Sequence, residues 1–205
     1  MKIFAFADIH CDYELLKKIV SRANRSDIDI VISCGDLSWF GSGIDECFEI
    51  LSDIKKPTLI ISGNHDRNED INSFCKAHSN FVNINHKKYV FKDHLFVGYA
   101  EGGFGHIDPK LKLLSKQFKL FFKEHKGKKV LVLHGPPHGT KCDDRSCWHP
   151  PGIHNGSITA RNLIEQSDID LVLCGHIHEC GDCMDKIGKA VILNPSKRGK
   201  VIEIK

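Results

Sequence analysis

Near its start the chain reads Ile3-Phe4-Ala5-Phe6-Ala7-Asp8-Ile9-His10, a short apolar run that ends in two side chains able to bind a metal ion. An uninterrupted apolar run of this length predicts a buried strand over residues 3–7. Asp8 and His10 then stand directly after that strand. In an open α/β sheet, ligands bind at the carboxyl ends of the strands. This stretch therefore indicates both a sheet and a site at its edge.

The same arrangement recurs four times along the chain, because apolar runs at 28–33, 57–62, 130–133 and 171–174 each predict a strand. The runs lead, in order, into Gly35-Asp36-Leu37, Gly63-Asn64-His65-Asp66, His134-Gly135-Pro136-Pro137 and Gly175-His176-Ile177-His178. One histidine at a strand end is usually a hydrogen-bonded rim residue, but five clusters at one edge would require five coincidences. Glycines beside four of the clusters allow the backbone to turn sharply beneath a site. The pattern predicts a metal site at the carboxyl edge of the strands.

Helical patterns separate these strands. Apolar spacing predicts helices over 15–23, 44–54 and 71–77, while Asp108-Pro109 and Ser157 are typical starts of two further helices, the second ending at 166. Residues 89–99 read as a β-hairpin. Strand–helix alternation indicates a largely parallel sheet, and closing strands at 190–193 and 201–204, with no helix between them, indicate a second, mixed sheet. The 205 residues fit one domain, residues 1–205.

The composition excludes few classes of protein, but together with the first residues it favours a cytoplasmic one. The formal net charge of +3 is too small to argue for nucleic acid or a membrane surface as partner. No apolar stretch approaches the ~20 residues of a membrane span, and the first residues lack the features of a signal peptide. We therefore expect a cytoplasmic protein whose nine cysteines are thiols or metal ligands, not disulfides. The oligomeric state is left open.

Four cysteines pose a separate question. Cys142 and Cys147 lie in a long polar loop over 135–156, and Cys180 and Cys183 form a Cys-x-x-Cys after His178. Both loops should leave the same sheet edge, where four thiols could form a closed tetrahedral zinc site. A Cys-x4-Cys is a weaker signal than a second close pair, so four unrelated thiols are the preferred interpretation.

The ordered set Asp-x-His, Gly-Asp, Gly-Asn-His-Asp, His and Gly-His-x-His resembles the calcineurin-like metallophosphoesterase superfamily. This resemblance covers residues 8–178. The stretch His134-Gly135-Pro136-Pro137-His138-Gly139-Thr140, followed by His154-Asn155-Gly156-Ser157, is similar to the small single-domain branch of uncharacterised and Icc-like phosphoesterases. The resemblance implies an α/β fold, a four-layer αββα sandwich with two mixed β-sheets and a metal site at the carboxyl edge of the strands.

The resemblance also implies a complete set of metal ligands. One ion would be held by Asp8, His10 and His178 and the other by Asn64, His134 and His176, with Asp36 bridging the two. Such a bridge brings two cations to about 3.5–4 Å, where a hydroxide between them acts as nucleophile. We accordingly expect Asp36 within about 4 Å of both His10 and His134. Imidazole, carboxylate and amide ligands suit two divalent transition-metal ions, Mn, Fe or Zn, better than Ca.

His65 and Asp66 are the catalytic candidates. By resemblance, His65 corresponds to the catalytic histidine of the family, which would stabilise charge on the phosphate and protonate the leaving oxygen. Asp66 beside it would orient that imidazole, or else cap the helix that follows; the residues leave both interpretations open. Arg67 could contact a substrate phosphate, although a solvated surface arginine is the preferred interpretation.

The expected function is a dinuclear-metal-dependent hydrolase of small phosphate esters, a phosphodiesterase that is more active with Mn than with Mg. A monoester dianion needs added positive charge, yet only Arg67 and Arg145 lie near the motifs. A phosphomonoesterase or protein phosphatase on the same metal core is an alternative, although the chain leaves no room for a domain that grips a large substrate. A non-catalytic metal-binding scaffold is a further alternative, and the intact His65 and ligand set argue against it.

Overall fold

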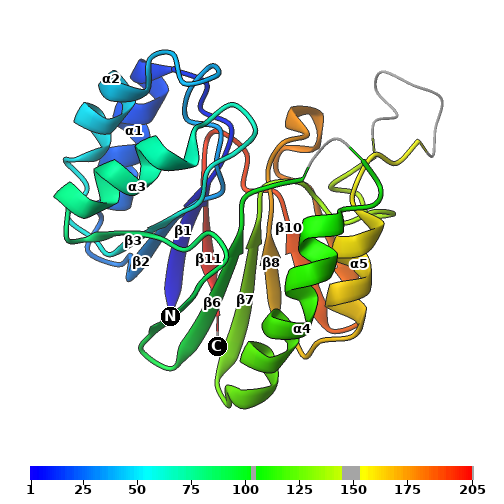
Figure 1. The fold of residues 1–205 in the computed structure, drawn as a ribbon. Helices are drawn as coiled ribbons and strands as arrows, with labels where there is room; N and C mark the ends of the chain where they lie inside the picture. The colour runs from blue at the N-terminus through cyan, green and yellow to red at the C-terminus, as the bar shows by residue number, and fades with distance from the viewer. Residues whose placement is uncertain (103–104, 145–152, 205) are drawn as a thin grey trace.

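The computed structural model describes residues 1–102, 105–144 and 153–204. Helices and strands alternate through the first half of the chain and strands close the second half (Figure 1). In chain order the elements are β1 (Lys2–Phe6), α1 (Tyr13–Ala23), β2 (Ile30–Ser33), α2 (Ile44–Leu51), β3 (Thr58–Ile60), α3 (Asn68–Ala77), β4 (Phe81–Asn83), β5 (Lys88–Phe91), β6 (His94–Tyr99), α4 (Pro109–Glu124), β7 (Lys128–Leu133), α5 (Ile158–Glu165), β8 (Leu171–Leu173), the 3₁₀ helix η1 (His178–Cys180), β9 (Met184–Ile187), β10 (Ala190–Leu193) and β11 (Lys200–Glu203).

The strands form two mixed sheets, which confirms the expected architecture. The first has the order β11-β1-β2-β3-β4, with β1 to β4 parallel and β11 antiparallel to β1. The second has the order β5-β6-β7-β8-β10-β9, in which β6, β7, β8 and β10 are parallel and the two edge strands are antiparallel. Figure 1 shows α1, α2 and α3 outside the first sheet and α4 and α5 outside the second. The result is an αββα sandwich.

Three apolar layers hold the sandwich together, and the period-2 alternation of β1 assigns its residues to two of them. Ile3 and Ala5 face the second sheet and pack in the central layer with Phe96, Val130 and residues of β8. Phe4 and Phe6 point the other way, toward α1 and α2. The third layer lies between the second sheet and α4 and α5. Because both faces of each sheet are covered, the strands read as continuous apolar runs.

Most expected elements are present, with three differences. Asp108 and Ser157 cap α4 and α5 as predicted, accepting hydrogen bonds from the N–H groups of Leu111 and Ala160. The helix expected over 44–54 ends at Leu51, while the strands β4 and β9 were not predicted. Their sequences, Phe-Val-Asn and Met-Asp-Lys-Ile, are short and partly polar because each lies at a sheet edge.

Five parallel strands position the functional loops. β1, β2 and β3 belong to the first sheet and β7 and β8 to the second, and all five end at the same edge of the sandwich (Figure 1). The site therefore lies across the seam between two sheets and not along one sheet. Within the described residues, no helix combines the length and apolar character that crossing a membrane requires.

Candidate metal centre

Tight backbone turns place the seven predicted ligands at this edge. Asp8, Asp36 and His176 have φ values of 58°, 57° and 69°, in the left-handed region that residues with a Cβ rarely adopt. Backbone hydrogen bonds between the loops hold these turns. The N–H of Asp8 donates to the carbonyl oxygen of Gly35 at 3.0 Å, and the N–H of His10 donates to the carbonyl oxygen of Asp36 at 3.1 Å. Strain of this kind persists only where the surrounding structure enforces it, and it is commonly found at functional sites.

Two glycines permit the loops to approach one another. A Cβ built on Gly63 would lie 2.0 Å from the Asp36 carboxylate, and one built on Gly175 would lie 2.7 Å from the Cβ of Ala7 and 3.0 Å from Asp8. Real Cβ atoms do not come so close to neighbouring atoms. These glycines are therefore needed for close approach, in addition to the sharp turns expected from the sequence.

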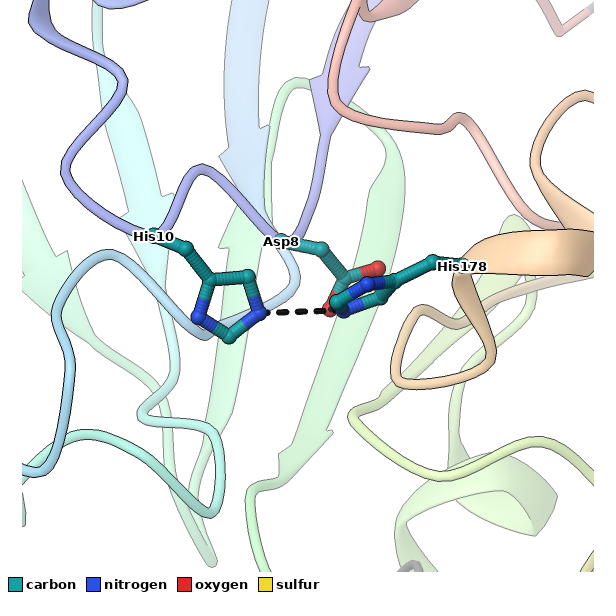
Figure 2. A group of neighbouring side chains, drawn as sticks. All are labelled: Asp8, His10 and His178. Carbon is teal, nitrogen blue, oxygen red and sulfur yellow. Dashed lines mark hydrogen bonds and ion pairs between the residues drawn. The ribbon is translucent and has the colours of Figure 1, made fainter.

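Asp8, His10 and His178 form the first ligand group (Figure 2). The Nε2 atoms of His10 and His178 lie 3.0 Å apart, and His178 Nε2 lies 3.9 Å from Asp8 Oδ1. His10 Nδ1 faces the carbonyl oxygen of Ser38 at 3.3 Å, so that Nδ1 carries the hydrogen and Nε2 is left to bind a cation. Two histidines 168 residues apart in sequence thus aim at one point.

Asp36, His134 and His176 form the second group, which Asn64 joins. The amide oxygen of Asn64 lies 2.8 Å from both His134 Nε2 and His176 Nδ1. His134 is fully buried, and its Nδ1 donates to the carbonyl oxygen of Cys34 at 2.9 Å. That bond orients the ring and presents Nε2 to the site.

Asp36 lies between the two groups. Its Oδ2 is 3.6 Å from His10 Nε2 and 3.3 Å from His134 Nε2. The other oxygen, Oδ1, accepts the N–H of His65 at 2.8 Å. Both histidine distances are within the ~4 Å expected of a carboxylate that bridges two cations.

Burial and charge shift the pKa values of these groups. Burial raises the pKa of Asp8, although His134 and the N–H of His176 oppose it. Burial acts in the same sense on Asp36, but hydrogen bonds and charge from His134 and the His65 N–H leave the pKa of Asp36 lowered. Burial alone would lower the pKa of His134, but the carboxylates of Asp36 and Asp8 raise it to about 9. Burial lowers the pKa of His10. The buried half of the site thus attracts positive charge.

This donor set fits divalent cations. Asp8 and Asp36 are both buried, and among the described residues their ion-pair partners are histidines, with no lysine or arginine. Burying two carboxylates beside rings that are neutral when they act as ligands costs free energy unless further positive charge is bound. Four imidazoles, two carboxylates and an amide oxygen would supply such ions with the mixed nitrogen and oxygen ligands that transition metals accept.

His65 lies beside the ligands, whereas Asp66 turns away to the backbone. His65 packs edge-on against His10 with ring centroids 4.8 Å apart, and its Nδ1 is buried with no hydrogen-bond partner among the described residues. His65 also falls within ligand distance of His10 and Asp36. Asp66 accepts hydrogen bonds from the N–H groups of Leu37, Ser38 and Gly63 at 2.9–3.2 Å and from the Ser38 hydroxyl.

The position of Asp66 departs from both interpretations that the sequence suggested. Its hydrogen bonds tie the turn after Asp36 to the turn after β3, and none of those found in the described residues reaches the His65 imidazole. It does not cap α3 either, because the N-cap residue of that helix is Arg67, which makes no side-chain capping bond. Four backbone and hydroxyl donors outcompete an imidazole because they surround the carboxylate.

The cysteines that the structure describes form no candidate metal site. Cys142 and Cys180 are buried, and their thiols point to the carbonyl oxygens of Cys183 and Asp144 at 3.5 and 3.1 Å. Among the described residues, no candidate ligand group contains a cysteine. Cys147 and Arg145 lie outside the described residues, so the expectations that named them are not tested by this structure.

Two cavities flank the ligands. One of about 480 Å³ is lined by Asp36, Asn64, His65 and His176 and also by His106 and Asn155. Another of about 410 Å³ is lined by Asp8, His10, Trp39, Asn194, Ser196 and Lys197. His178 borders both. Asn155 belongs to the His154-Asn155-Gly156-Ser157 stretch that carries the family resemblance, although no role was predicted for it. No sequence pattern indicated His106, whereas two adjacent aromatic residues directly after the Asp36 cluster were a usable signal for Trp39.

Comparisons with known proteins agree with this site. A family model described as calcineurin-like phosphoesterase matches residues 1–180. Uncharacterized protein MJ1162 of Methanocaldococcus jannaschii is 32% identical over 219 residues, covering 97% of this chain and 89% of that protein. The crystal structure of TT1561 of Thermus thermophilus has a TM-score of 0.73 at 19% identity, covering 96% and 89% of the two chains.

A structure described as a novel archaeal phosphodiesterase has a TM-score of 0.51 at 15% identity, covering 96% of this chain and 84% of that one. At 19% and 15% identity, the similarity to these two solved structures shows a shared fold. The family match spans most of the chain, and the M. jannaschii relative exceeds 30% identity over nearly its whole length. The chain therefore belongs to the calcineurin-like phosphoesterases, which are hydrolases of phosphate esters.

Proposed function

We propose that this protein is a dinuclear-metal-dependent phosphodiesterase acting on small esters. The observation that carries the proposal is the position of Asp36, whose carboxylate lies 3.6 Å from His10 of one ligand group and 3.3 Å from His134 of the other. Asp8, His10 and His178 would hold one ion, and Asn64, His134 and His176 the other. When bound, two such ions activate a water molecule and neutralise phosphate charge.

His65 has the surroundings of a residue that meets the substrate. Its backbone N–H is held by Asp36, which fixes the imidazole beside the ligands at the wall of the larger cavity. Its buried Nδ1 has no hydrogen-bond partner among the described residues, so it would gain one from a phosphate oxygen. The proposed role is to stabilise charge on the phosphoryl oxygens and to protonate the leaving oxygen. Asp66 would support this indirectly by holding the two loops together.

Two features favour a diester over a monoester. The ligands lie between two cavities that meet at His178, which leaves room for a substituent on each side of a phosphate. No arginine lines either cavity within the described residues, and Lys197 of the smaller cavity lies 3.8 Å from the Asp12 carboxylate, which offsets its charge. Little positive charge is therefore available there, beyond the two ions, for a monoester dianion. The fold is also that of an archaeal phosphodiesterase of known structure, which supports the same substrate class by analogy.

The ligand set favours Mn, Fe or Zn as the bound ions. Four of the seven ligands would be imidazoles, while Mg prefers oxygen ligands and retained water. The cysteines of the described part of the chain are free, which is consistent with a cytoplasmic location. We include that location in the proposal.

The test compares kcat/KM for bis-p-nitrophenyl phosphate and p-nitrophenyl phosphate with Mn and with Mg. We expect the diester to be preferred and Mn to support more activity than Mg. A tenfold preference for the monoester would refute the substrate class and leave the metal mechanism standing. Full activity with Mg and none with Mn would contradict the ligand assignment. A metal-loaded protein that hydrolyses neither ester would contradict the enzymatic proposal as a whole.

A further inference from the structure

The turn that follows the Asp36 cluster is pinned to the backbone of His65. The carbonyl oxygen of His65 accepts hydrogen bonds from the Gly41 N–H at 2.9 Å and from the Ser38 hydroxyl at 2.8 Å. Trp39 and Ser42 close the turn through a pair of backbone hydrogen bonds at 3.2 and 2.9 Å. The backbone of the turn therefore has a defined conformation next to the ligands before any ligand binds.

Two large aromatic side chains project from this turn. Trp39 is 49% exposed and Phe40 is 70% exposed, although large apolar side chains of this kind are usually buried. Phe40 also has a φ of 52°, which is uncommon for a bulky residue. An exposed aromatic pair on a strained turn contributes little to folding, so its position calls for a functional reason.

The aromatic rings lie against the groups that would handle the phosphate. The indole of Trp39 stacks on His10 with ring centroids 4.2 Å apart and an interplanar angle of 29°. It also meets His65 edge-on at 4.9 Å, and Phe40 lies 4.1 Å from the His65 ring. Two apolar aromatic rings thus lie directly beside the proposed leaving-group acid.

Trp39 lines the smaller cavity together with three of the proposed ligands. It has a volume of about 410 Å³, within the range of pockets that bind small molecules. Besides Asp8, His10 and His178, its lining includes Asp12, Ser196 and Lys197, which supply further polar groups. Lys197 Nζ is 3.8 Å from Asp12 Oδ2, so the cavity offers both a hydrogen-bond donor and an acceptor. A nucleobase needs this combination of a flat apolar wall and polar edges.

We propose that Trp39 and Phe40 form a platform on which the base of a nucleotide-type phosphate ester stacks, with its phosphate at the ligands. The inference rests on the proposed function and narrows its substrate class from small esters to esters of nucleosides. Stacking of a base on an aromatic side chain contributes about 1–3 kcal/mol, which is about 5- to 150-fold in affinity. The platform would therefore determine specificity, while the ligands and His65 perform the chemistry.

A purely structural role predicts a different result. If Trp39 and Phe40 only positioned His10 and His65, their removal would weaken every phosphate ligand equally. The platform predicts instead that only ligands with a base lose affinity. Adenosine 5′-monophosphate and ribose 5-phosphate separate the two roles, because both carry the same sugar phosphate and differ in the base.

The experiment measures dissociation constants of the Mn-loaded protein for these two monoesters by calorimetry. We expect adenosine 5′-monophosphate to bind at least about tenfold more tightly, and Trp39→Ala to reduce that ratio below about twofold. Trp39→Phe should retain most of the ratio. Leu113→Ala, an exposed apolar residue on α4 and remote from the site in sequence, serves as the matched control and should leave it unchanged.

A second measurement locates the base. The sequence contains two tryptophans, so Trp148→Phe leaves Trp39 as the sole fluorophore of its kind. Adenosine 5′-monophosphate should quench its fluorescence and ribose 5-phosphate should not. Equal affinities for the two ligands, or a base preference that survives in the Trp39→Ala/Phe40→Ala double variant, would overturn the platform. Turnover of bis-p-nitrophenyl phosphate is measured separately, so loss of the proposed function and loss of the platform give different results.

Discussion

The two halves of the candidate metal centre are held in different ways. The buried half consists of Asp36, Asn64, His134 and His176, and there Asp36 is 1% and His134 0% exposed. The open half consists of Asp8, His10 and His178. His178 is 52% exposed and is the first residue of the short 3₁₀ helix η1. Asp8 is buried like Asp36, and Asn64 and His176 are half-buried, so the two halves differ chiefly in the exposure of His178.

This difference indicates which part of the site is ordered before an ion binds and which part becomes ordered with it. Packing and hydrogen bonds hold His134 in position with or without an ion, so the buried half is preorganised. An exposed histidine on a short 3₁₀ helix has fewer contacts and would gain more order from a bound ion. We therefore expect the ion of the open half to exchange first. The following predictions test this comparison, from the largest effect to the smallest.

Asp36 joins both halves, so its loss should have the largest effect. We expect Asp36→Ala to lose metal from both halves and to reduce turnover of bis-p-nitrophenyl phosphate by about 10³-fold or more, since the ions supply several kcal/mol of charge stabilisation. Metal analysis and steady-state kinetics measure both effects. Asp36→Asn, which keeps the shape, should behave similarly, and the exposed Asp53→Ala is the control. Near-normal metal content in Asp36→Ala would contradict the bridging role.

Exchanging one histidine of each half tests the comparison directly. His134→Ala removes a buried partner of Asp36 and should lower the free energy of unfolding of the metal-free protein by about 2–4 kcal/mol. His178→Ala should change it by less than about 0.5 kcal/mol, because the residue is half exposed. The His178→Ala variant should lose only the ion of the open half. Urea unfolding in a chelator and metal analysis measure these quantities. Equal destabilisation by both variants would abolish the distinction between the halves.

His65 should affect turnover without affecting the ions. We expect His65→Ala to retain nearly full metal content and to lose about 10²-fold in turnover, which is typical for a general acid or charge stabiliser. His125→Ala, which lies at the end of α4, is the control. If His65→Ala loses metal, then His65 is a ligand, as its closeness to His10 and Asp36 also permits.

The smallest effect concerns pH. The pKa of His134 is raised from 6.5 to about 9 in the folded protein. Its protonation therefore contributes fully to the free energy of unfolding below pH 6.5, and that contribution is lost as pH rises toward 9. The contribution of His10 to stability has the opposite pH dependence. Because its pKa is lowered in the folded protein, that contribution is lost as pH falls below about 6.5. The free energy of unfolding of the metal-free protein should therefore decline between pH 6.5 and 9, on the order of 1–3 kcal/mol.

Metal provides the control for that pH effect. A bound ion replaces the proton on the ligand nitrogen, so the metal-loaded protein should gain stability over the same range instead of losing it. Urea titrations at several pH values, with chelator and with Mn, measure both curves. A metal-free protein whose stability rises steadily from pH 6.5 to 9 would contradict a protonated His134.

The sequence predicted the ligand clusters because their signal is local. A short apolar run and the polar residue that follows it are neighbours in the chain, and burial requires that pattern wherever a strand enters a covered sheet. Asp8, Asp36 and His134 could be singled out in this way. The caps of α4 and α5 were predictable for the same reason, since Asp108 and Ser157 satisfy N–H groups three residues ahead.

Tertiary structure decided what depends on distant segments. The sequence did not reveal that β1 to β3 and β7 to β8 belong to different sheets, or that Asn64 meets a histidine 70 residues away. Nor did it predict the role of Asp66, whose partners include Leu37, 29 residues back along the chain. Local patterns record which residues are buried, whereas packing between layers selects the partners that buried groups meet. The sequence therefore identified the candidate ligands, and their mutual arrangement arose only when the two sheets packed together.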